Sequence, residues 1–180
     1  MPTALNGEQW MAVLERLAKA LPAEGSPVRL CLIGSAACLF GGMDGRTSAD
    51  LDIWKPASDY DRLELALAAK EAGLLFDPKT TLEPDNPYLQ LVEPGLTQLG
   101  EFVPVFVERL GRLHIYRPPV ENLIAAKLIR AELKDLGDIN FLVSRHRPNL
   151  QRIREIVASF ELSAREKATE NLVYLEVLKP

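Results

Sequence analysis

The first regular hydrophobic pattern in the chain predicts an amphipathic helix that ends before Pro22. Asn6 and Gln9 have the spacing of a capping box, in which each side chain accepts the other residue's backbone N–H group. Apolar side chains then recur every three or four residues, at Trp10, Val13, Leu14, Leu17 and Leu21. One face of this helix is therefore expected to be buried.

Two short segments that follow, residues 28–33 and residues 50–54, are predicted to be strands. The first is apolar and rich in branched side chains, which favours a buried strand, and the second alternates between acidic and apolar residues. Between them we expect a short helix over residues 36–40 and a glycine-rich loop over residues 41–48.

The middle of the chain is expected to be less regular. Ser58 is predicted to cap a helix over residues 59–73. Residues 74–101 are rich in Pro, Gly, Asp and Asn, and this composition predicts turns with one strand near residues 88–92.

A β-hairpin is predicted next, with strands over residues 102–107 and 113–116 joined near Gly111. Pro104 within the first strand favours an edge position or a bulge. From Pro118 onward the apolar spacing is helical only.

This order of elements predicts an α/β (α+β) fold. Residues 1–117 are expected to form a small mixed β-sheet flanked by helices, and residues 118–180 an all-helical part packed on it. With 47% hydrophobic and 26% charged residues in 180, the chain is unlike disordered or collagen-like sequences and fits one domain with a helical extension.

Charge and targeting signals narrow the class further. The formal net charge of −4 gives no overall basic field, so any nucleic-acid contact must come from a local patch. Such a patch, or an ordinary solvated helix end, is formed by Arg145, His146, Arg147, Arg152 and Arg154. No secretion signal or membrane-length apolar stretch is found, which predicts a cytoplasmic protein without membrane contact. Cys31 and Cys38 are expected to be buried thiols.

The densest chemistry lies in the second strand, where Asp50 and Asp52 are two residues apart. Residues two apart in a strand point to the same face, so both carboxylates share one face. Two neighbouring carboxylates repel each other unless a cation lies between them. Mg²⁺ prefers hard oxygen ligands and binds through one or two carboxylates plus phosphates, so a magnesium site is predicted here, with Mn²⁺ as an equivalent ion.

Gly34 and Ser35 supply the complementary feature. Gly34 permits a tight turn after the first strand, and Ser35 opens a helix whose first N–H groups attract an anion. Each feature alone is more often an ordinary turn or an exposed strand. Their order and spacing, with Arg46 and Ser48 just before the acidic pair, favour a site for a triphosphate and its metal.

These residues resemble the signature of the polymerase-β-like nucleotidyltransferase superfamily. Gly34-Ser35, a short helix and then Arg46-Thr47-Ser48-Ala49-Asp50-Leu51-Asp52 are most similar to the AbiEii-type branch, which includes toxins of toxin–antitoxin systems. Ser48 stands where that branch usually has threonine. The resemblance implies a sheet of nucleotidyltransferase type, an NTP substrate and a bound Mg²⁺.

The resemblance continues in the helical part, so that it spans residues 28–145. Residues 118–128 are similar to a P-E-D-L-I-A-x-K-L segment and residues 134–139 to a K/R-D-x-x-D-I segment. By this resemblance Lys127 and Asp138 are active-site residues. The residues themselves allow two interpretations of Lys127, a surface charge on a buried stem or an inward cation that meets phosphates or Asp138.

A third metal-binding carboxylate is common in the superfamily, on a strand beside the acidic pair. That strand is expected near residues 102–107, which contain no acidic residue. Glu101 and Glu108 flank it, and Glu108 is the better candidate for a metal ligand; both are otherwise exposed glutamates.

The sequence therefore predicts a nucleotidyltransferase that moves a nucleotide from an NTP to a hydroxyl. The acceptor cannot be read from the residues; the resemblance implies RNA, with a tRNA end as one form, or a protein side chain, and a toxin role would bring an antitoxin protein as partner. The alternative is a catalytically degenerate nucleotide-binding or partner-binding module with the same fold, which the lack of a clear third carboxylate favours.

Overall fold

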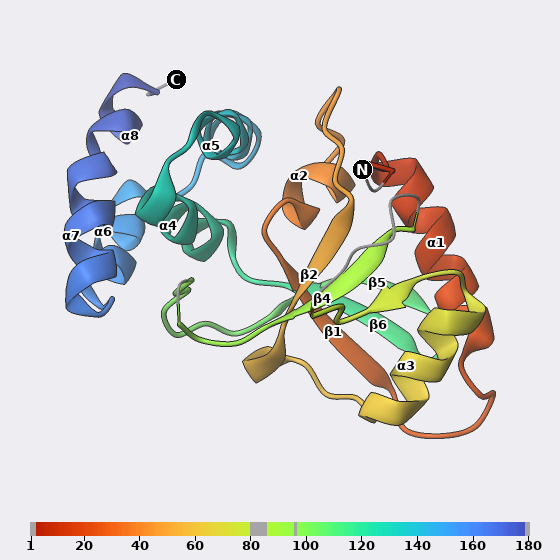
Figure 1. Cartoon of the computed structure of the whole chain (residues 1–180). Helices are drawn as coiled ribbons and strands as arrows, with labels where there is room; N and C mark the ends of the chain where they lie inside the picture. Colours follow the sequence, from red (N-terminus) through yellow and green to blue (C-terminus); the bar gives the residue numbers. More distant parts are fainter. Residues whose placement is uncertain (1–2, 80–85, 96, 179–180) are drawn as a thin grey trace. The chain divides into compact units, whose positions relative to one another are not determined.

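The computed structural model describes residues 3–79, 86–95 and 97–178. The chain divides into two compact units, Met1–Glu93 with Val105–Arg117, and Pro94–Pro104 with Pro118–Pro180 (Figure 1). One crossing between the units falls at Pro118, where the sequence pattern places the boundary. The segment Pro94–Pro104, which the pattern assigns to the α/β part, belongs instead to the helical unit. Among the described helices, none has the length and apolar character that crossing a bilayer requires.

The first unit is built on a mixed six-stranded sheet of the described residues, with the strand order β3-β4-β2-β1-β6-β5. The strands β2, β4 and β3 are mutually parallel, β1 is parallel to β6, and β1–β2 and β5–β6 are antiparallel. Their bounds are Val28–Ile33 (β1), Asp50–Trp54 (β2), Leu75–Phe76 (β3), Tyr88–Val92 (β4), Val105–Leu110 (β5) and Leu113–Arg117 (β6).

Two helices, α1 (Gly7–Ala20) and α3 (Arg62–Glu71), cover one face of this sheet (Figure 1). The expected capping box at Asn6 starts α1 and is confirmed. The apolar faces of both helices enter one core with the alternate strand residues Leu51 and Ile53, which are almost fully buried. Because strand side chains alternate, Asp50 and Asp52 lie on the opposite face of β2 from this core.

Local differences from the sequence predictions have simple causes. The helix α3 starts at Asp61, whose carboxylate accepts the N–H of Glu64, and not at Ser58. Ser58 instead follows the 3-10 turn η1 (Lys55–Ala57), where its hydroxyl donates to the Trp54 carbonyl and accepts the Cys31 N–H. Both residues are good caps, so the pattern could not choose between them.

The hairpin strand β5 begins after Pro104, three residues later than expected, because proline cannot donate to the ladder. It lies at the sheet edge, and its pairing with β6 shifts between Phe106 and Glu108, as the proline suggested. The two-residue strand β3 escapes the sequence pattern because it is too short to show a period.

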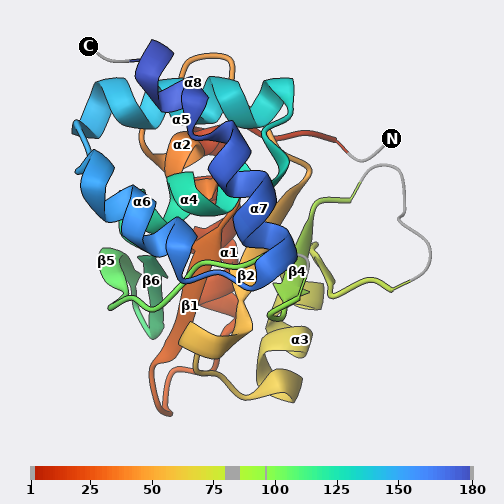
Figure 2. The ribbon, with the colours of Figure 1, turned by 90° about the vertical axis from the view of Figure 1, so that its left-hand side faces the viewer.

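The second unit is a group of helices around α4 (Val120–Arg130), which contacts α5 (Leu133–His146), α6 (Leu150–Ala158) and α7 (Leu162–Asn171) (Figure 2). A short helix α8 (Val173–Val177) follows. The segment Pro94–Pro104 is attached to this unit, because the buried Asn122 amide donates to the carbonyls of Leu99 at 2.7 Å and Glu101 at 3.3 Å.

Candidate functional site

The turn after β1 brings Gly34 against the carboxylate of Asp52. In the antiparallel pair β1–β2, Ile33 is opposite Asp52, so the residue after Ile33 turns beside the acidic strand. Gly34 has a φ of +68°, and a Cβ atom built on it would lie 2.6 Å from Asp52 Oδ2. The positive φ favours glycine here, and any larger residue would also have to displace the Asp52 carboxylate, which approaches the main chain where the sequence predicts a phosphate cradle.

Ser48 fixes the other carboxylate of the pair. Its hydroxyl donates to Asp50 Oδ1 at 2.8 Å, and its side chain is nearly buried. Its backbone is bridged in both directions to Leu5, and the Trp10 indole N–H donates to its carbonyl at 3.0 Å. The loop end before Asp50 is thereby tied to the start of α1.

Arg46 links the loop to the turn after β1. One of its terminal nitrogens donates to the hydroxyl of Ser35, the residue that precedes the short helix α2 (Ala36–Phe40). The Ser35 hydroxyl makes no capping bond to the helix. With five residues α2 has little macrodipole, so an anion here would meet the first backbone N–H groups and the Arg46 guanidinium.

Tyr88 joins this group, and the sequence pattern did not single it out. It is opposite Asp50 in the parallel pair β2–β4, and the two side chains are hydrogen-bonded. Burial raises the pKa of the Tyr88 hydroxyl above its ordinary value, and the negative charges of Asp50 and Asp52 raise it further. Tyr88 therefore stays protonated and donates to Asp50, and both carboxylates lie within its electrostatic reach.

The structure does not bring Glu108 to the acidic pair. The strand β5 is at the sheet edge, with β6 and β1 between it and β2, which corresponds to about 14 Å at ordinary strand spacing. Glu108 is exposed and accepts the Arg109 N–H. Its prediction as a neighbouring metal ligand is therefore wrong, because the strands beside β2 are β1 and β4, and on β4 Gln90 stands opposite Asp52. The described residues contain no group of three or more His, Cys, Asp or Glu that fits a metal ion.

Two carboxylates on one face still fit a hard divalent ion. Magnesium sites in proteins often use one or two carboxylates and take their other ligands from phosphates and water. Hydroxyl donors such as Ser48 and Tyr88 orient a ligating carboxylate without cancelling its charge. The donor set at Asp50 and Asp52 therefore fits Mg²⁺ or Mn²⁺ bound together with a triphosphate.

In the second unit Lys127 is part of a buried ion cluster. Its Nζ donates to Asp138 Oδ2 at 2.7 Å and lies 3.7 Å from Asp135 Oδ1. Arg130 donates two hydrogen bonds to Asp135, at 2.7 and 2.9 Å. The Lys127 side chain is 8% exposed and that of Asp138 1%, so the interpretation of Lys127 as a surface charge is wrong. The expected contact with Asp138 is confirmed, whereas a role at phosphates stays a prediction.

The charge state of Asp135 follows from this cluster. Burial by itself raises the pKa of the Asp135 carboxyl, but the Arg130 hydrogen bonds and the charges of Lys127 and Arg130 outweigh it. The resulting pKa lies below the ordinary range, so Asp135 is ionised at neutral pH. It also accepts the Glu132 N–H at the start of α5, which places it where a helix favours negative charge.

Other candidates are structural. Cys31 and Cys38 are both buried free thiols, as expected, and burial raises the pKa of Cys31 to about 12, which leaves it protonated and unreactive. In the basic cluster, Arg152 pairs with Glu155 and Arg154 with Glu176. These pairs favour a solvated helix face over an RNA-binding patch.

Comparison of the chain with protein-family models, with curated proteins and with solved structures gave no match.

Proposed function

We propose that the protein is a metal-dependent nucleotidyltransferase of the polymerase-β-like superfamily, in its AbiEii-type branch. The observation that supports it most is the contact of Asp52 with Gly34, where a Cβ atom would lie 2.6 Å from the carboxylate. This contact brings the acidic strand β2 next to the turn at Gly34, and these are the two parts of the motif on which the family resemblance rests. The links from Ser48 to Asp50 and from Arg46 to Ser35 hold the intervening loop in the same group.

Each residue has a distinct part in the proposed reaction. Asp50 and Asp52 hold Mg²⁺ or Mn²⁺, and the bound ion supplies positive charge to the triphosphate. The main chain at Gly34 and Ser35 and the Arg46 guanidinium bind the β- and γ-phosphates. The acceptor hydroxyl oxygen forms a bond to the α-phosphorus while the bond from that phosphorus to the bridging oxygen breaks. Pyrophosphate leaves, and the hydroxyl proton passes to a carboxylate or to water.

Thermal unfolding with and without nucleotide tests the binding step. Magnesium together with an NTP is expected to raise the midpoint of the wild type and not that of Asp50→Asn/Asp52→Asn. Asp44→Asn/Asp59→Asn is the matched control, since both of its residues are exposed in the same unit and the charge change is equal. If no NTP with Mg²⁺ moves the wild-type midpoint, the proposal fails.

Incubation with labelled NTPs separates transfer from binding. We expect label to appear on RNA, a tRNA end being one acceptor, or on protein, and to be lost in Asp50→Asn/Asp52→Asn. In the toxin form of the proposal, expression of the wild type slows growth and the double variant relieves it. Equal growth inhibition by both would contradict that form.

A second candidate function is a degenerate nucleotide-binding module. The observation that favours it is that the described residues contain no group of three or more His, Cys, Asp or Glu side chains that could hold a metal ion. Its signature is an Mg²⁺- and NTP-dependent rise in the unfolding midpoint without transfer of label to any acceptor.

A further inference from the structure

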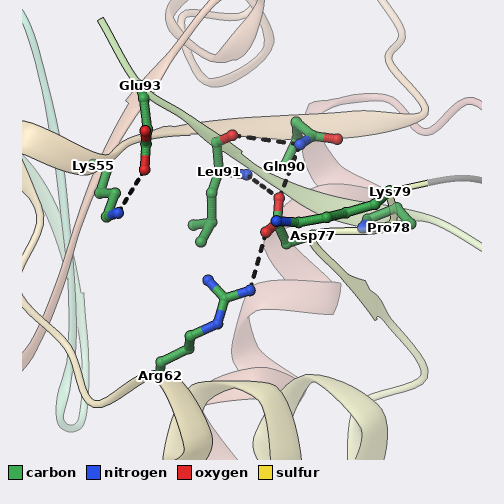
Figure 3. A pocket seen from close by; sticks show the side chains of 8 residues that line it. All are labelled: Lys55, Arg62, Asp77, Pro78, Lys79, Gln90, Leu91 and Glu93. Carbon is green, nitrogen blue, oxygen red and sulfur yellow. Dashed lines mark hydrogen bonds and ion pairs between the residues drawn. The ribbon is translucent and has the colours of Figure 1, made fainter.

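A polar pocket of about 620 Å³ lies in the first unit, and its lining does not include Gly34 (Figure 3). It is formed at the carboxyl ends of the parallel strands β3, β4 and β2, because Asp77 and Lys79 follow β3, Glu93 follows β4 and Lys55 follows β2. Ligands of open α/β sheets bind preferentially outside the carboxyl ends of parallel strands. The volume is within the range of small-molecule sites.

Three cations from three different segments surround the pocket: Lys55, Arg62 at the start of α3, and Lys79 (Figure 3). They face two carboxylates, Asp77 and Glu93, so the lining carries one net positive charge. The pair of Lys55 with Glu93 joins side chains that are 53% and 64% exposed. An exposed ion pair of this kind is weak, and an incoming anion can replace Glu93 at Lys55.

Asp77 belongs to the wall of the pocket and does not repel an anion strongly. Its side chain is 8% exposed, and its carboxylate accepts from Arg62 at 3.1 Å, from the Gln90 amide at 3.0 Å and from the Leu91 N–H at 3.4 Å. Of these donors only the Arg62 guanidinium offsets the charge of Asp77, whereas the two neutral donors hold the carboxylate in place. Its φ of +48° is a conformation that few non-glycine residues adopt, so the chain after β3 is held in a specific turn.

The guanidinium of Arg62 is positioned for a ligand by contacts on two sides. It lies over the Phe76 ring, 5.3 Å from its centroid, and uses one terminal nitrogen for Asp77. Arginine has five N–H donors in a planar fork, and most of them are not used by the described residues. A planar fork with lysines on either side matches the several oxygens of a phosphate group better than a single carboxylate.

We propose that this pocket binds a phosphate group, through Arg62 with Lys55 and Lys79. Leu91 provides an apolar floor beside it, on which the uncharged part of a phosphate ester rests (Figure 3). Asp50 and Asp52 are not part of its lining, and the proposal does not rest on nucleotide transfer. The phosphate belongs either to a free mononucleotide or to a nucleic-acid backbone.

The test is calorimetric titration of the full-length chain with inorganic phosphate, AMP and a ten-nucleotide single-stranded RNA. EDTA is present, so that the acidic pair carries no metal ion. We expect Lys55→Gln/Lys79→Gln to weaken binding at least about tenfold, the effect of losing two charge-assisted hydrogen bonds. The matched control, Lys19→Gln/Lys70→Gln, removes the same charge from exposed positions of the unit and is expected to bind as the wild type.

The source of the phosphate follows from the three ligands. Equal affinity for AMP and RNA indicates a mononucleotide site, whereas tighter RNA binding that falls steeply with salt indicates a nucleic-acid backbone. The proposal is overturned if none of the ligands binds, or if Lys55→Gln/Lys79→Gln binds like the control. It is also overturned if Asp50→Asn/Asp52→Asn abolishes binding, because the phosphate would then occupy the other site.

Discussion

The acidic pair of the first unit and the ion cluster of the second differ in what holds their carboxylates. Hydroxyl groups of Ser48 and Tyr88 donate to Asp50, whereas the ammonium of Lys127 meets Asp138. A neutral donor orients a carboxylate and leaves its charge available to a metal ion. A cation neutralises the carboxylate, and burial then makes the pair hard to open. Both places contain the residues of the family resemblance, but the donors to Asp50 are neutral hydroxyls, whereas the donor to Asp138 is a cation.

The largest expected effect of a single change is at Lys127. Lys127→Met leaves Asp138 buried without its cation, and breaking such a pair costs about 3–5 kcal/mol. Urea unfolding of the variant is expected to show this loss in the free energy of unfolding. Lys127→Met/Asp138→Leu removes both charges and is expected to recover most of it. A double variant as unstable as the single one would contradict the assignment of a paired structural cluster.

A catalytic role for Lys127 is tested with the same two variants, Lys127→Met and Lys127→Met/Asp138→Leu. If its ammonium serves the reaction, the stable double variant transfers no label, although its unfolding free energy is restored. If the cluster is only structural, nucleotide transfer returns together with stability.

The second prediction concerns the turn under Asp52. Gly34→Ala adds a Cβ atom 2.6 Å from the carboxylate at a φ of +68°, whereas Gly42→Ala, at a φ of +81°, has nothing within 4 Å. The left-handed backbone alone costs roughly 1–2 kcal/mol in both variants. Any further loss of stability in Gly34→Ala, together with loss of the Mg²⁺- and NTP-dependent rise in midpoint, measures the contact with Asp52. Equal stability and equal nucleotide response of the two variants would show that the contact of residue 34 with Asp52 supports neither the fold nor binding.

The sequence pattern located the parts of this site that depend on local order. The strands β1, β2 and β4 lie where the apolar runs indicate, and the spacing from Gly34 to Asp52 already suggests their meeting. The sequence pattern failed for residues whose position depends on which strands are neighbours in the sheet. The prediction for Glu108 assumed that β5 lies beside β2, and no local pattern encodes the order β3-β4-β2-β1-β6-β5.

The sequence pattern missed Tyr88 and the polar pocket at Arg62 for the same reason. Tyr88 reaches Asp50 only through the register of β4 against β2, and that register is set by the packing of Leu51 and Leu89 in the core. The pocket joins residues from the ends of three strands and the start of α3. Neither arrangement has a signature in consecutive residues.

The third prediction, of a smaller effect, is that Tyr88→Phe weakens the acidic pair without disturbing the fold. It removes one hydroxyl that donates to Asp50, a loss of about 0.5–1.5 kcal/mol. Titration with Mn²⁺ is expected to show weaker binding for Tyr88→Phe than for the wild type. Tyr60→Phe is the control, because Tyr60 is in the same unit and has no recorded contact with Asp50. Unchanged Mn²⁺ affinity in Tyr88→Phe would limit Tyr88 to packing.

The smallest expected effect is the pH dependence that Asp135 contributes to the second unit. Because the folded-state pKa of Asp135 is lowered, its ionised form stabilises the fold at any pH above the unfolded value of about 4. This contribution is lost as pH falls from about 4 through the lower folded pKa, where Asp135 takes up a proton and its bonds with Arg130 and Lys127 weaken. In Asp135→Asn the group no longer titrates, so the decline below pH 4 is expected to be shallower than in the wild type. The comparison is made by unfolding in urea at successive pH values, and parallel declines would show that other carboxylates cause the acid sensitivity.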